Sequence, residues 1–79
     1  MDQIPDTKPG NYYVSAINGT RKTLLAGPFK RHETALALLE VARNIAIEID
    51  PYAHFWDFGT ARTPETFNEL GTLNRNGLL

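Results

Sequence analysis

The chain has 79 residues and no cysteine, and its 8 Lys and Arg against 9 Asp and Glu give a formal net charge of −1. Hydrophobic residues make up 42% of it, which at so balanced a charge is too many for a wholly disordered chain. This composition excludes a disulfide framework and a thiolate metal site, and no apolar run approaches the roughly 18 residues that a membrane helix needs.

The first ten residues predict a mobile arm. Residues 1–10 are polar and include Pro5, Pro9 and Gly10, a composition that favours a loose chain end over a secretory signal. We therefore expect one small domain over 11–71, in the cytoplasm, followed by a loose tail at 72–79. A domain of this size has little room for an enclosed catalytic pocket.

A β-hairpin is expected from Asn11 to Ala26. Asn18-Gly19 favours a type I′ turn, which needs positive φ at both central residues, and a two-residue loop there pairs Ile17 with Thr20. A longer loop with a bulge would shift this pairing, and a one-residue slip would exchange the faces. One face has the better apolar continuity away from the turn; it holds Tyr12, Val14, Ala16, Arg21, Thr23 and Leu25.

Gly27-Pro28 is expected to end the second strand, and a helix to run from near His32 to Ile49. Glu33 suits the positive end of the helix dipole, whereas the usual N-cap residue is missing at Arg31. Asp50-Pro51 ends the helix, because a residue before proline avoids the α region. Apolar residues recur in this helix at three- and four-residue spacing and predict one buried side: Ala35, Leu38, Leu39, Ala42, Ile45, Ala46 and Ile49.

A third strand is predicted over 52–60, from alternation that places Tyr52, His54, Trp56 and Phe58 on one face and Phe55 on the other. The element order ββαβ then predicts an α+β domain. Its sheet would have three antiparallel strands in the order 2-1-3, with the helix on one face.

The residues after this strand predict a short C-terminal helix over 64–70. Thr63 is a suitable cap, Pro64 suits the first helical position, and Gly71 suits the end. Phe67 and Leu70 would then touch the body of the domain.

No catalytic or metal-binding pattern stands out. His32 and His54 belong to no short-range ligand motif, and Ser15 lies in no nucleophile elbow. We therefore expect neither an enzyme nor a metal or other cofactor.

The sequence favours binding as the class of function. Bulky apolar side chains on both faces of the predicted third strand exceed what one helix covers, so the tail, a second copy in a homodimer, or a protein partner must cover the rest. Nucleic-acid binding is the alternative, since aromatic side chains on an open sheet face rimmed by cations can stack on bases. The candidate binding residues are basic side chains near the turn, the helix start and the third strand, together with strand aromatics: Arg21, Lys22, Lys30, Arg31, Tyr52, His54, Trp56 and Arg62.

Two stretches resemble known families. Gly27-Pro28-Phe29 with the helix start resembles the strand-to-helix junction of SPOR peptidoglycan-binding domains, which implies topology only. The segment 50–62 (DPYAHFWDFGTAR), with Gly71 to Asn74, resembles small uncharacterised proteins of phages, prophages and plasmids. By size and context alone, such proteins are similar to anti-CRISPR proteins. The resemblance implies a non-enzymatic protein that binds a host protein complex and blocks it sterically.

Overall fold

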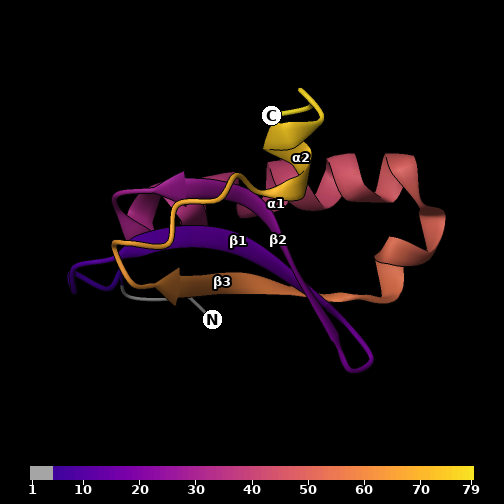
Figure 1. Ribbon diagram of the computed structural model, residues 1–79. Helices are drawn as coiled ribbons and strands as arrows, with labels where there is room; N and C mark the ends of the chain where they lie inside the picture. Colours follow the sequence, from indigo (N-terminus) through magenta and orange to yellow (C-terminus); the bar gives the residue numbers. More distant parts are fainter. Residues whose placement is uncertain (1–4) are drawn as a thin grey trace.

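The computed structural model describes residues 5–79, and its elements follow in the order that the sequence predicts for most of the chain (Figure 1). They are β1 (Asn11–Asn18), β2 (Arg21–Phe29), α1 (His32–Ile49), the 3₁₀ helix η1 (Pro51–Phe55), β3 (Asp57–Thr63) and α2 (Thr72–Arg75). The strands form one antiparallel sheet in the order β2-β1-β3. The predicted α+β class and strand order are thus confirmed.

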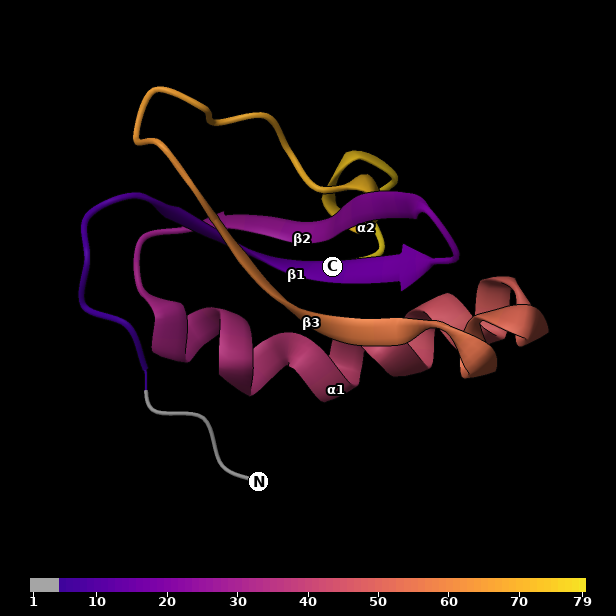
Figure 2. The same ribbon diagram turned by 90° about the horizontal axis from the view of Figure 1, so that it is seen from below.

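The helix α1 lies along one face of the sheet, and three alanines let its backbone come close (Figure 2). Ala35, Ala42 and Ala46 are its buried residues, and they pack against Tyr12 and Val14 of the central strand β1. The predicted bounds of this helix are confirmed, and Arg31 makes no side-chain capping hydrogen bond. The buried side of the helix ends before Ile49, the last residue predicted for it, because Ile49 is 60% exposed.

The hairpin register differs from the prediction by two residues. Asn18 pairs with Arg21 and Ile17 with Lys22, so the turn residues are Gly19 and Thr20. Only Gly19 has a positive φ there, which excludes the predicted type I′ turn. Because side chains alternate with a period of two, a two-residue shift leaves each one on its predicted face.

The second strand also runs further than predicted. Register shifts between Tyr12 and Ser15 accommodate extra residues in β2, and the ladder resumes where Tyr12 pairs with Phe29. Gly27-Pro28 therefore lies within β2 rather than at its end.

The strand predicted at 52–60 is wrong in its first half. Pro51–Phe55 forms the 3₁₀ helix η1, and β3 begins only at Asp57. Asp50 explains this start, because its side chain accepts a hydrogen bond from the Tyr52 amide at 3.0 Å, as a helix cap does. Tyr52, His54, Trp56 and Phe58 consequently do not share one strand face.

The C-terminal helix is present but not at 64–70. A turn at 65–66 is followed by a segment without regular secondary structure over 67–71, and the helix forms over Thr72–Arg75. The segment 67–71 covers the sheet face opposite α1. The Tyr13 hydroxyl donates to the Glu69 carbonyl at 2.7 Å, and the side-chain amide of Asn11 donates to the Phe67 carbonyl at 2.6 Å. Figure 2 shows this segment on the far side of the sheet from α1.

The tail predicted to be loose at 72–79 is docked in part. Leu73 is buried in the core between β2 and α1, and Leu79 packs against the same core. Asn74 accepts a hydrogen bond from the Gly27 amide at 2.8 Å and donates to the Leu79 carbonyl at 3.1 Å.

The N-terminal arm contacts the body of the domain. Residues 1–4 of the predicted arm lie outside the described residues. Among 5–10, the Asp6 amide donates to the His32 ring at 2.6 Å, and the Pro9 carbonyl accepts from Arg62 at 3.1 Å. The mobility predicted for this arm stays a prediction.

Candidate protein-binding surface

An apolar tip projects at the end of the molecule where α1 gives way to η1. It consists of Ile49, Tyr52 and Phe55, which are 60%, 76% and 81% exposed. The turn of η1 explains their exposure: Ala53 alone points inward and is fully buried, so its neighbours point outward. Large apolar side chains left this exposed together are typical of an interaction site.

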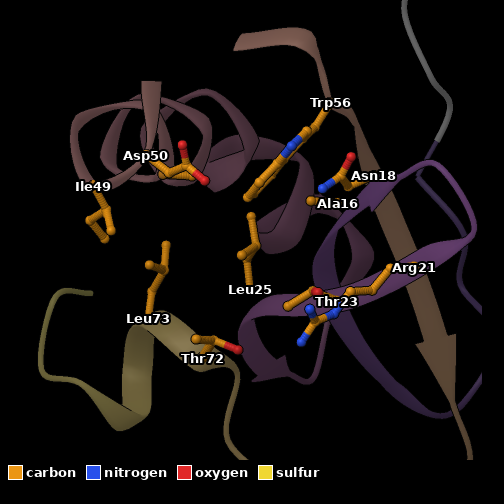
Figure 3. Close-up of a pocket in the computed structure, with 11 residues that line it drawn as sticks. Ala16, Asn18, Arg21, Thr23, Leu25, Ile49, Asp50, Trp56, Thr72 and Leu73 are labelled. Atoms are coloured by element: carbon orange, nitrogen blue, oxygen red, sulfur yellow. The ribbon is translucent and has the colours of Figure 1, made fainter. Parts of the chain in front are cut away.

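A cleft of about 270 Å³ adjoins this tip, and we call it the Trp56 pocket (Figure 3). Leu25 of β2, Leu73 of α2 and Trp56, which lies between η1 and β3, reach into it. Trp56 stacks on Phe58 with ring centroids 6.4 Å apart, and the Arg43 guanidinium lies 5.8 Å from the Phe58 centroid. The remaining lining residues are Ala16, Asn18, Arg21, Thr23, Ala46, Ile49, Asp50 and Thr72.

The segment that forms the tip is acidic, although Arg21 and Lys22 of the hairpin lie toward the same end of the domain. Residues 44–61 carry Glu48, Asp50 and Asp57 but no lysine or arginine. The last turn of α1 holds no basic residue, so the negative end of its dipole adds to these charges. None of the three carboxylates makes an ion pair within residues 5–79. The tip segment therefore carries a local negative charge.

The eight candidate residues from the sequence fall into two groups. Arg21, Lys22, Tyr52, His54 and Trp56 lie toward the hairpin turn and the end of α1, and of these Arg21 and Trp56 share the pocket. The other group lies toward the opposite end of α1, which spans about 27 Å.

That second group is engaged locally. Arg31 pairs with Glu33, and Arg62 lies 3.8 Å from Asp6. Lys30 and Arg31 line a separate groove against the N-terminal arm. The eight candidate residues therefore do not form one continuous surface.

The open aromatic sheet face on which nucleic-acid binding depended is not formed either. Tyr12 is buried under α1 and Tyr13 under the C-terminal segment. A different basic groove exists on the second face, where Arg21, Lys22 and Arg75 lie beside Phe67 and Glu69.

The two buried tyrosines, Tyr12 and Tyr13, have raised pKa values. Burial raises the pKa of Tyr13, and the Glu69 carboxylate adds to the rise. Burial also raises the pKa of Tyr12; Asp6 adds to that rise and Arg62 opposes it. Both hydroxyls donate to backbone carbonyls, so they serve the fold.

The histidines lie in different settings. His32 bridges the Asp6 amide and the Thr60 hydroxyl and stacks on Tyr12, with centroids 5.1 Å apart. His54 is exposed and meets Phe55 edge to face. Within residues 5–79, no cluster of three or more His, Asp or Glu side chains is placed to hold a metal ion.

Sequence reasoning did not select several members of this surface, among them Ile49, Asp50, Phe55, Leu25 and Leu73. Ile49 fitted the helical stripe, and Phe55 was expected on a strand face, so the turn at Asp50-Pro51 decided the exposure of both. The signal that was available is the Asp-Pro pair itself, which also suits the start of a 3₁₀ turn.

The chain matches no protein-family model, no curated protein and no solved structure. The resemblance to proteins of mobile elements therefore stays a prediction. In the described part of the chain, α1 and the shorter helices lack the length and apolar character to cross a bilayer.

Proposed function

We propose that this domain works by binding a protein partner through the apolar tip and the Trp56 pocket beside it. The observation that carries the proposal is the exposure of Tyr52 and Phe55, at 76% and 81%, next to an apolar pocket that holds the single tryptophan. Tyrosine and tryptophan are among the residues that contribute most to binding energy at protein interfaces. The hydrophobic core does not include Tyr52 or Phe55, so neither side chain is needed to complete it.

The charge around the tip supports a basic partner surface. Glu48, Asp50 and Asp57 flank the tip in the chain without an ion pair, and the negative end of α1 lies beside it, while Arg21 offers one positive charge in the adjoining pocket. Such a field speeds association with a cationic surface and disfavours acidic ones. The resemblance to mobile-element proteins extends the proposal: the partner is a host protein complex, such as a defence system, that the bound domain blocks sterically.

Co-purification from host lysate tests the proposal. Tagged wild-type protein should retain a partner in stoichiometric amount, and the double variant Tyr52→Ser/Phe55→Ser should lose it, because each interface anchor contributes about 2 kcal/mol, or about 30-fold in Kd. Leu70→Ser is the matched control, since Leu70 is 54% exposed but lies outside the tip. Full retention of the partner by the double variant contradicts the proposal.

A second candidate is binding of single-stranded nucleic acid in the groove of Arg21, Lys22 and Arg75. Three cations against one carboxylate, beside the partly exposed Phe67 ring, favour it. Such binding must weaken steeply with salt. A mobility-shift assay at low salt that shows no complex contradicts this candidate.

A further inference from the structure

We propose that the Trp56 pocket receives one bulky aliphatic or aromatic side chain of a partner segment, with a basic residue of that segment beside Asp50 and an acidic residue beside Arg21. This inference deepens the proposed function and takes from it only that the partner is a protein. Its evidence is the size, the charge pattern and the rigidity of the pocket.

The size and lining suit one large apolar side chain. An apolar cavity of roughly 150 Å³ already accepts a benzene-sized molecule, so about 270 Å³ leaves room for a leucine or phenylalanine side chain. Leu25, Leu73 and Trp56 provide apolar walls on different sides of it (Figure 3). The Ala16 and Ala46 side chains are too short to fill the space between them.

The two charges at the rim carry opposite signs. Asp50 stands on the α1 side and Arg21 on the hairpin side (Figure 3). The Asp50 carboxylate accepts a hydrogen bond from the Tyr52 amide at 3.0 Å, and this bond orients it. Within residues 5–79 neither side chain makes an ion pair. A segment with one positive and one negative side chain beside its apolar residue matches both.

Hydrogen bonds within the domain hold Leu73, and the pocket wall that it forms, in place without a partner. The Gly71 amide donates to the Gly27 carbonyl at 3.0 Å, and Asn74 accepts from the Gly27 amide at 2.8 Å. The Leu78 amide donates a hydrogen bond to the Leu73 carbonyl at 2.9 Å. A preformed wall reduces the entropy lost on binding.

Short blocked peptides and the fluorescence of Trp56 test this inference, because the chain has one tryptophan. We use acetylated, amidated Lys-Leu-Glu and Glu-Leu-Lys, which present the charges in either direction. At least one should bind with a Kd on the order of 1 mM. The same peptide with alanine in place of leucine should bind about tenfold more weakly, because the apolar burial is lost.

Matched variants locate the binding. Asp50→Asn keeps an oxygen acceptor for the Tyr52 amide but removes the charge, and should weaken binding about threefold. Glu65→Gln, which removes an exposed charge outside the pocket, should leave the Kd unchanged. Thr23→Leu fills the pocket from β2 and should abolish binding, with a thermal melt to show that this variant folds.

Two results would overturn the inference. One is unchanged Trp56 fluorescence with both peptides at about 20 mM, well above the expected Kd. The other is equal binding of the leucine and alanine peptides. Either result leaves the proposed function standing if the Tyr52→Ser/Phe55→Ser variant still loses its partner, so the two failures are distinguishable.

Discussion

The Gly71 amide donates a hydrogen bond to the Gly27 carbonyl at 3.0 Å, and this contact marks the place where the C-terminal segment crosses the edge of β2. A Cβ at Gly71 would lie 2.6 Å from the backbone of Leu25 and Ala26. The crossing carries the chain from the face over Tyr13 to the pocket side, where α2 places Leu73. The covered second face and the pocket wall therefore depend on the same contact.

Gly71→Ala should destabilise the domain by about 1–3 kcal/mol, because the added methyl group overlaps backbone that cannot move aside cheaply. Urea unfolding measures this loss. Gly59→Ala is the control, since nothing lies within 4 Å of a Cβ there. Equal stability of Gly71→Ala and the wild type would contradict the close backbone contact between Gly71 and β2.

Leu73→Ala should cost about 2–5 kcal/mol, because Leu73 is buried and the small domain cannot refill the space. Leu78→Ala, at an exposed leucine five residues later, should change the free energy of unfolding by less than about 0.5 kcal/mol. Denaturant melts of the two variants make the comparison. Similar values for both would contradict the docking of α2.

Alkaline pH should lower the stability of the protein through its two buried tyrosines. Burial raises the pKa of Tyr13 and Tyr12 above the ordinary value of about 10. The unfolded chain then releases these protons first, so their stabilising contribution is complete below about pH 10 and is lost as pH rises through the folded pKa values. Thermal melts from pH 8 upward should show a falling Tm above about pH 10.

Tyr13→Phe separates the two effects of that side chain. It removes the hydrogen bond to the Glu69 carbonyl and should cost about 1 kcal/mol at pH 7. Because it also removes one titrating hydroxyl, its Tm should fall less steeply than that of the wild type above about pH 10. If the Tm of the two proteins fell in parallel with rising pH, the assignment of part of this fall to the Tyr13 hydroxyl would be contradicted.

His32→Phe should loosen the N-terminal arm at Asp6 while leaving the core intact. Phenylalanine can keep the stacking on Tyr12 but cannot accept from the Asp6 amide or bond to Thr60. Hydrogen exchange of the Asp6 amide should therefore become faster. Exchange of the Val14 amide in the central strand serves as the internal control, and an unchanged Asp6 rate would count against the tether.

Local patterns were reliable where one periodicity ran without interruption. The spacing of Ala35, Ala42 and Ala46 predicted α1 with both ends, and the alternation in β1 predicted which side chains share a face. The face assignment survived a wrong turn position because the error was two residues. The strand order followed from the short hairpin and the helical crossover.

The candidate site was less predictable, because two periodicities compete after Asp50. Tyr52, His54 and Trp56 alternate as a strand would, yet the Asp50 side chain and Pro51 start a 3₁₀ turn first. That turn exposes Tyr52 and Phe55, and only α2 and β2 together complete the pocket around Trp56.

By itself, then, the sequence determined the ββαβ order, the helix and the antiparallel sheet, since these depend on periodicity and short connections. Tertiary structure alone decided what covers the second face and what remains exposed. The segment 67–71 can cover Tyr13 only where Gly71 permits backbone to cross backbone, and such a contact between residues 44 positions apart leaves no periodic trace in the chain.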